Sequence, residues 1–266
     1  MNFTAKDVAA LREKTGCGMM DCKKALTASE GDMEKAIDFL REKGLAASVK
    51  KAGRIAAEGV AFATVSEDGK VGVVIEVNAE TDFVAKNADF QAFVKTCADT
   101  VIEQNPADVE ALLACKAAGT EETVDALLKE KILTIGENIK IRRFAFFVDG
   151  VSVPYIHAGG KIGVLVNLDT DLAPEQVAEV GKDMAMQIAA LNPRFLDKSE
   201  VDEATLEEEK KILLVQMEND PKMAAKPDKV KQGIVTGKLR KFYEENCLLQ
   251  QEFVKDSSMS VEQYVA

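Results

Sequence analysis

The chain of 266 residues has few of the residue types on which acid–base and nucleophilic catalysis depend. It contains a single histidine, His157, so a catalytic serine or cysteine would lack its usual basic partner. It has neither a G-x-x-x-x-G-K-[ST] phosphate loop nor a G-x-G-x-x-G turn between a strand and a helix. We therefore expect a protein that is not an enzyme and that binds no cofactor.

Paired cysteines and long apolar runs are missing as well. The five cysteines are an odd number without a disulfide framework or a paired zinc spacing, which favours a reducing compartment and no metal site. No window approaches the roughly 18 apolar residues of a membrane helix, and the N-terminus lacks the apolar segment of a signal peptide. We expect a cytoplasmic protein that does not contact membranes.

Acidic residues outnumber basic residues over most of the chain. The formal net charge is -11 and the isoelectric point is near 4.8, which argues against direct nucleic-acid binding, because that binding requires a positive surface. Residues 1–54 hold 11 Lys and Arg against 8 Asp and Glu, a net of +3, so residues 55–266 carry -11 - 3 = -14. A mildly basic head before an acidic body favours docking on another protein.

The head has the pattern of three short helices. The first begins after Thr4 and stops at Gly16, the second spans about Met19–Ala28, and the third begins after Asp32 and ends before Gly44. Three such helices bury only a small core, so the head is suited to docking.

The loop between the first two helices carries two adjacent methionines, Met19 and Met20. Methionine adapts to irregular partner surfaces, although either side chain could instead fill the core of the bundle. The following segment, Leu45–Ala57, is predicted to be a partly helical linker.

Beyond Gly59 the apolar period changes from 3.6 to 2 residues. Two strands, Gly59–Ser66 and Lys70–Asn78, are joined at Asp68-Gly69, a strong hairpin signal. The same pattern returns 91 positions later without a gap, where Gly69-Lys70-Val71-Gly72 corresponds to Gly160-Lys161-Ile162-Gly163. An internal duplication explains this. Each copy continues into a helix, expected at Asn87–Glu103 and at Pro174–Leu191.

The second copy contains an insertion with the pattern of an antiparallel helical hairpin. Its expected arms are Ser199–Met217 and Lys229–Glu245, separated by a turn in which Pro221 and Pro227 break the helix. The apolar stripe is weaker than that of a self-sufficient coiled coil. The hairpin is either a solvated spacer or a protein-contact arm.

These elements predict an α+β fold with antiparallel sheets covered by helices. We expect a three-helix docking domain with its linker at 1–54 and a core N-subdomain at 55–140. A core C-subdomain at 141–266 would carry the helical hairpin at 197–246.

The Thr81-Asp82-Phe83-Val84 turn is the most unusual feature of the core. Phe83 follows a strand and opens a helix, where it either caps the core or enters a partner, a contact of roughly 1.5–3 kcal/mol. Shifted by 91 positions, residues 81–83 fall on Leu172, Ala173 and Pro174. The duplicated scaffold does not require an aromatic ring there, which favours a task beyond packing.

Three motifs together resemble the signatures of the bacterial elongation factor Ts family, and the resemblance runs in order from the N-terminus to about Tyr264. The motifs are Thr15-Gly16-Cys17-Gly18-Met19-Met20-Asp21-Cys22-Lys23-Lys24-Ala25-Leu26, Thr81-Asp82-Phe83-Val84-Ala85-Lys86-Asn87 and Ile135-Gly136-Glu137-Asn138-Ile139. The resemblance implies a guanine nucleotide exchange factor whose partner is elongation factor Tu. It also implies a ubiquitin-associated-like head, a duplicated core and an inserted coiled-coil hairpin.

By the same resemblance, Asp82 would bond to the G domain of the partner while Phe83 wedges between its helices near magnesium, with Thr81 and Val84 completing the motif. Residues of the head would grip the G domain, namely Arg12, Met19, Met20 and Lys23. Ile135, Gly136 and His157 would be core contacts, and Phe253-Val254 would touch the partner beside the hairpin. His157 could equally be a structural histidine.

Two other functions stay open at this point. The chain could be an adaptor or holdase that binds proteins without altering nucleotide affinity. A cysteine-dependent enzyme would lose activity on alkylation of Cys17 or Cys22. Whether the helical hairpin joins two complexes into a dimer of heterodimers is also open.

Overall fold

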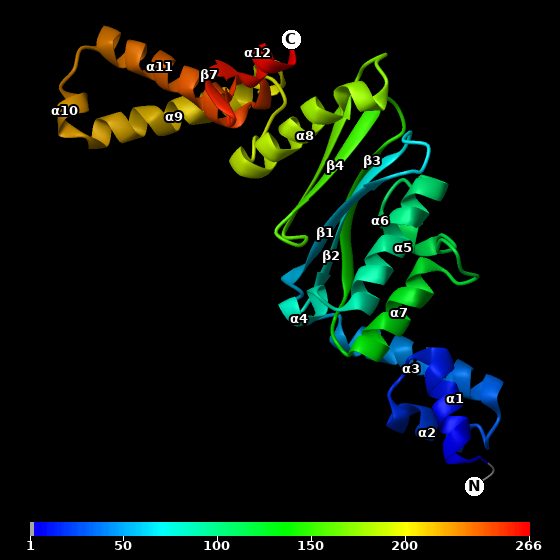
Figure 1. The fold of residues 1–266 in the computed structure, drawn as a ribbon. Coiled ribbons are helices and arrows are strands. Elements are labelled where there is room, and N and C mark those ends of the chain that lie inside the picture. Colours follow the sequence, from blue (N-terminus) through cyan, green and yellow to red (C-terminus); the bar gives the residue numbers. More distant parts are fainter. Residues whose placement is uncertain (1–2) are drawn as a thin grey trace. The chain divides into compact units, whose positions relative to one another are not determined.

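A computed structural model describes residues 3–266 and has the expected α+β fold with small antiparallel sheets (Figure 1). The chain divides into two compact units, one ending at Glu175 and one beginning at Gln176. The boundaries expected near residues 54 and 140 stay predictions. Within residues 3–266, no helix combines the length and apolar character needed to cross a bilayer.

The first unit begins with the three expected helices, α1 (Ala5–Thr15), α2 (Met19–Ala28) and α3 (Met33–Lys51). The Thr4 hydroxyl accepts the Asp7 amide hydrogen, and the Asp7 carboxylate accepts from the Thr4 amide, so a capping box starts α1. Gly16 ends the helix in the left-handed region at φ 64°. Leu11, Leu26 and Leu40 form the centre of the small core.

Helix α3 does not end before Gly44, which corrects the expected boundary. A Cβ at Gly44 would lie 3.3 Å from the Lys129 carbonyl oxygen of α7 (Val124–Ile135). The glycine therefore allows two helices to approach closely and does not act as a helix cap. The linker is helical only as far as Lys51, where α3 ends, and it is thus partly helical as expected. The Lys51 ammonium donates to the Ile132 carbonyl 3.0 Å away and so fixes this end of α3 to α7.

The first sheet has the order β1-β2-β3, with both pairs antiparallel. Its strands are β1 (Glu58–Val65), β2 (Gly72–Ala79) and β3 (Lys140–Phe147). Helix α5 (Ala88–Gln104) covers one face and lies beside α7 (Figure 1). The fully buried Phe90 of α5 belongs to the same core as Val73, Ile75 and Val77 of β2. Two short helices, α4 (Asp82–Ala85) and α6 (Val109–Ala114), were not expected.

A second hairpin, β4 (Val151–His157) with β5 (Ile162–Leu168), repeats the register of the first. Val60 pairs with Val77 in the first hairpin, and Val151 pairs with Leu168 in the second, with both partners displaced by 91 positions. The repeat found in the sequence is therefore a repeat of strand pairing.

The two hairpins pack on each other through equivalent small residues. A Cβ at Gly72 would lie 2.3 Å from the Ser152 Cβ, and a Cβ at Gly163 would lie 2.9 Å from the Ala61 Cβ. Gly72 and Gly163 are 91 positions apart, as are Ala61 and Ser152, so the two contacts are related by the duplication. The missing side chains let the sheets meet at backbone distance.

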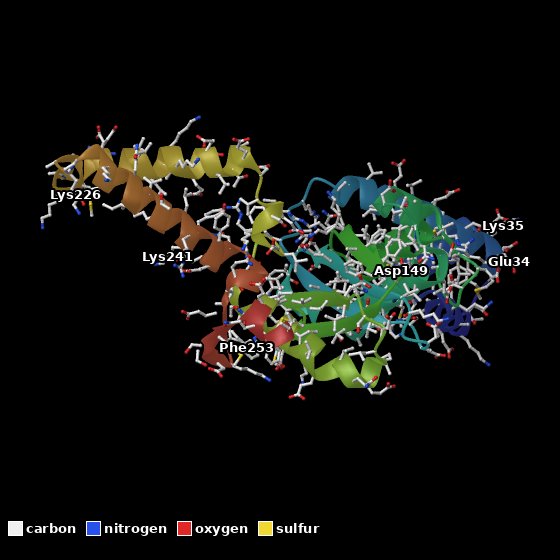
Figure 2. All side chains as sticks on the ribbon, turned by 90° about the horizontal axis from the view of Figure 1, so that it is seen from above. Glu34, Lys35, Asp149, Lys226, Lys241 and Phe253 are labelled. Atoms are coloured by element: carbon white, nitrogen blue, oxygen red, sulfur yellow. The ribbon has the colours of Figure 1, made fainter. Side chains whose placement is uncertain are left out.

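The second unit contains most of α8 (Pro174–Leu191), the helical hairpin and a small β-pair. Its elements after α8 are η1 (Lys198–Glu200), α9 (Glu203–Asn219), α10 (Pro221–Ala224), α11 (Asp228–Asn246), η2 (Leu248–Gln250), β6 (Glu252–Phe253), β7 (Asp256–Ser260) and α12 (Val261–Val265). Helices α9 and α11 are the predicted arms. Figure 2 shows Lys226 near the turn between them and Lys241 on α11. Met217, Phe242 and Cys247 are buried within this unit.

We expect Gly72→Ala to lower the free energy of unfolding by about 1–3 kcal/mol, because the new methyl group overpacks the contact between the hairpins. Urea denaturation would measure the change. Gly53→Ala is the matched control, since a Cβ there meets no atom within 4 Å. Adding Ser152→Gly to Gly72→Ala should recover part of the loss. Equal stability of Gly72→Ala and Gly53→Ala would contradict the close packing.

Candidate partner interface

The Phe83 turn (Glu80–Lys86) exposes one aromatic ring to solvent, while the neighbouring Val84 of the same turn is buried. The Thr81 hydroxyl accepts the Val84 amide hydrogen at 3.4 Å and so caps the single turn of α4. Val84 is 8% exposed and packs in the core of the first unit, whereas Phe83 is 81% exposed. The core therefore anchors the turn through Val84, and Phe83 does not cap it.

The Phe83 turn also carries charged side chains. The Lys86 ammonium donates to the Asp82 carboxylate at 2.7 Å, one helical turn apart. This hydrogen bond lowers the pKa of Asp82, and the positive charge of Lys161 lowers it further. Lys161 follows β4 and also donates to Glu58 at 2.6 Å. The turn thus offers a partner one apolar ring beside a carboxylate that stays ionised.

Glu137, which the sequence did not single out, holds the backbone of the Phe83 turn. One carboxylate oxygen accepts the Glu80 and Thr81 amide hydrogens, each at 3.0 Å, and the other accepts the Thr81 hydroxyl hydrogen at 2.7 Å. Glu137 stands inside a motif that resembled a known signature, but only its neighbours Ile135 and Gly136 were expected at the interface. No spacing in the sequence indicates a contact with residues 56 and 57 positions away.

Glu80 makes the reciprocal contact. Its carboxylate accepts the Asn138 amide hydrogen at 2.6 Å and lies 3.4 Å from the Arg54 guanidinium. The buried Asn138 side chain donates in turn to the Arg54 carbonyl at 2.8 Å. Three segments distant in sequence therefore meet below the Phe83 turn.

A groove of about 310 Å³ opens beside Phe83. Its lining includes Ile135 at the end of α7 and Gly16 after α1, so the structure brings two expected interface segments next to the aromatic ring. Gly136, the following residue, is exposed and adopts φ 89°, a left-handed conformation that ends α7. Each of the three motifs thus contributes at least one residue to the lining of this groove in the first unit.

The four expected head residues are all exposed, on α1 for Arg12 and on α2 for Met19, Met20 and Lys23. Met19 is 54% exposed and Met20 is 63% exposed. The alternative that one of them fills the bundle core is therefore wrong. That core is filled by leucines, with the buried thiols of Cys17 and Cys22 beside them.

His157 is exposed at the end of β4. Its Nδ1 lies 3.0 Å from the Tyr155 hydroxyl, and the two rings stack with centroids 6.0 Å apart. The histidine is held by a neighbour on its own strand, and its other edge is available to a partner.

Phe253 and Val254 lie in the second unit and differ in exposure. Phe253 is 3% exposed and stacks on Tyr264 with ring centroids 4.2 Å apart, whereas Val254 is 46% exposed. The Val254 amide donates to Gln187 at 2.9 Å, and Lys255 pairs with Asp183 at 2.6 Å. Of the two expected contacts, only Val254 offers its side chain directly.

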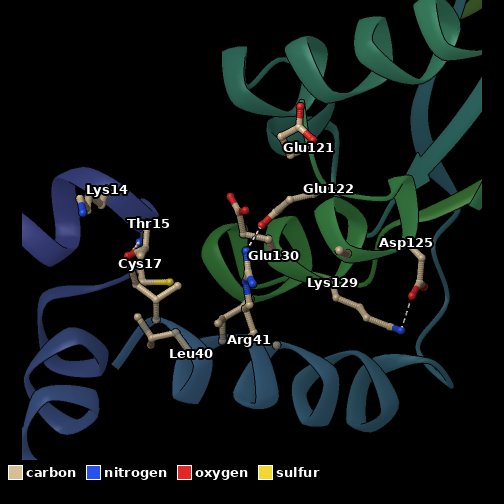
Figure 3. A pocket seen from close by; sticks show the side chains of 14 residues that line it. Lys14, Thr15, Cys17, Leu40, Arg41, Glu121, Glu122, Asp125, Lys129 and Glu130 are labelled. Atoms are coloured by element: carbon tan, nitrogen blue, oxygen red, sulfur yellow. Dashed lines mark hydrogen bonds and ion pairs between the residues drawn. The ribbon is translucent and has the colours of Figure 1, made fainter. Parts of the chain in front are cut away.

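The larger cavity, of about 660 Å³, lies elsewhere in the first unit, and none of the expected interface residues lines it. Figure 3 shows the Cys17 sulfur among its lining side chains, together with the ion pairs Arg41–Glu122 and Lys129–Asp125. Burial raises the pKa of the Cys17 thiol, which disfavours a reactive thiolate. The cavity therefore has no evident part in the interface around Phe83.

Comparison with known proteins supports the resemblance seen in the motifs. The family model described as elongation factor TS matches residues 80–266. The elongation factor Ts of Trichlorobacter lovleyi is 50% identical over 272 residues, which cover 100% of this chain and 86% of that protein. The elongation factor Ts of Clostridium kluyveri is 50% identical over 266 residues, covering 99% of this chain and 86% of the relative. This chain belongs to the elongation factor Ts family.

Proposed function

We propose that the chain is a guanine nucleotide exchange factor that releases GDP from elongation factor Tu in the cytoplasm. The observation that carries this proposal is the 81% exposure of Phe83 on a turn whose base is buried and hydrogen-bonded. An exposed aromatic ring on a rigid base suits insertion between elements of a partner, because little conformational entropy is lost on binding.

The proposed exchange follows from thermodynamic linkage. A protein that binds the nucleotide-free GTPase more tightly than the GDP form must weaken GDP binding by the same factor. Phe83 would enter the G domain near its magnesium site, and the ionised Asp82 would bond to the partner beside it. GTP binding then displaces the factor. No covalent bond is made or broken, and neither a cofactor of its own nor a nucleic-acid contact is required.

The remaining contacts would set affinity. Arg12, Met19, Met20 and Lys23 present two flexible apolar side chains between two cations, which suits a surface of mixed charge. Ile135, Gly136 and His157 would extend the contact around Phe83. In the second unit, Val254 would touch the partner directly, and the buried Phe253 would support it from below. The helical hairpin carries exposed Ile212, Val215 and Val230 and would act as a protein-contact arm.

We expect Phe83→Ala to slow GDP release at saturating factor about tenfold or more, because burial of the ring supplies roughly 1.5–3 kcal/mol. Release of labelled GDP from elongation factor Tu, followed by stopped flow with the chain in saturating excess, measures the rate. Phe147→Ala is the control, since Phe147 is a partly exposed aromatic outside the turn. An unchanged rate of GDP release with Phe83→Ala would contradict the proposed insertion of the ring. Stable binding by the wild-type chain without faster release would instead support an adaptor.

A separate effect is expected for the head. Met20→Ala should raise the concentration of factor needed for half-maximal release about fivefold while leaving the maximal rate unchanged, because the side chain contributes to docking and not to the wedge. Titration of the factor against elongation factor Tu·GDP separates the two quantities. Val49→Ala, which shortens an apolar side chain that is 70% exposed on α3, is the matched control. A lower maximal rate with an unchanged half-saturation point would contradict the assignment.

A further inference from the structure

We propose that Glu137 is a positioning residue for Phe83. It does not touch the partner but holds the turn that presents the ring. The proposal rests on the proposed exchange function for its consequence, whereas the anchoring itself is a property of the free chain. The relevant contacts lie within the first unit.

The Glu137 carboxylate fixes both the backbone and the cap of the turn. It accepts two consecutive amide hydrogens, from Glu80 and Thr81, immediately before α4 begins. It also accepts the hydroxyl hydrogen of Thr81, which leaves a lone pair of that oxygen free to accept from the Val84 amide. The orientation of the hydroxyl is therefore set by Glu137, and the cap of α4 depends on it.

The contact is reciprocal, and this makes it rigid. The Glu80 carboxylate accepts the Asn138 amide hydrogen while the Glu137 carboxylate accepts the Glu80 amide hydrogen. Each of two adjacent chain segments thus satisfies a backbone donor of the other. The Glu137 side chain is half-buried, so its charged hydrogen bonds are stronger than they would be in open water.

Anchoring at this place controls the direction of Phe83. The ring is attached two residues after the second anchored amide, and the next residue, Val84, is buried in the core. With residue 81 held on one side and residue 84 on the other, the backbone of residues 82 and 83 has little freedom. When the residues that hold such a side chain in place are removed, the rate of the reaction falls even though the contacting side chain itself is intact.

The experiment is a double-mutant cycle between Glu137 and Phe83. Glu137→Ala should reduce the maximal rate of GDP release from elongation factor Tu about tenfold, and Glu137→Gln, which keeps an acceptor for the amides, should lose about threefold. In the Phe83→Ala background, Glu137→Ala should add less than a twofold loss, because residue 83 then carries no ring whose position the loosened turn could change. Glu121→Ala, which removes an exposed carboxylate that pairs with Lys116 and not with the turn, is the matched control.

A second measurement needs no partner. Amide hydrogen exchange in the free chain should be at least tenfold faster at Glu80, Thr81 and Val84 in Glu137→Ala, and unchanged in Glu121→Ala. Thermal unfolding establishes that each variant is folded, and Glu137→Gln replaces Glu137→Ala if the latter is not.

The outcomes separate the two proposals. Unchanged exchange at residues 80–84, or a full tenfold loss that persists in the Phe83→Ala background, would overturn the positioning role of Glu137. If Phe83→Ala alone leaves GDP release unchanged, the wedge fails, and the hydrogen-exchange result still decides whether Glu137 anchors the turn. Faster exchange together with a non-additive loss of rate would support both.

Discussion

The position of Phe83 depends on hydrogen bonds that its own turn cannot supply. The Glu137 carboxylate accepts the backbone donors of residues 80 and 81, and Val84 anchors the other side of the ring in the core. A large apolar side chain exposed on a flexible loop would pack back onto its own protein, because apolar surface favours burial. Anchoring on both sides keeps the ring in solvent, and the groove beside it exists because the same contacts hold the end of α7 nearby.

The duplicated core explains why such a turn could be altered without loss of the fold. The two hairpins share one register and meet through equivalent contacts, Gly72 with Ser152 and Gly163 with Ala61. The segment after the second strand carries no packing of this kind and differs between the copies, with Phe83 in one and Pro174 in the other. The choice of residue is thus constrained where the two hairpins touch, whereas the residue at the step from strand to helix can differ between the copies.

Local patterns in the sequence predicted most of the helices and strands. The predictions were wrong where a residue's role depends on its contact with a distant segment. Gly16 and Gly44 both follow helical segments, but only Gly16 ends its helix, since Gly44 serves the close approach of α7. The sequence indicated that Phe83 opens a helix, but not that this helix is the separate single turn α4, whose capping residue Thr81 donates to a side chain from another segment. Phe253 was expected at a surface and lies under Tyr264, a contact that spacing cannot indicate.

The sequence by itself determined the α+β class, the register-true repeat of 91 positions and the family, because caps, turns, alternation and signature motifs are properties of neighbouring residues. It also placed Phe83 in the first turn of a helix. Only the tertiary structure decided that this ring faces solvent, that Met19 and Met20 both do so, and that the Glu137 carboxylate accepts the backbone donors of the turn. These outcomes depend on which distant backbone donors, acceptors and apolar side chains meet, and the linear order of residues does not contain that pairing.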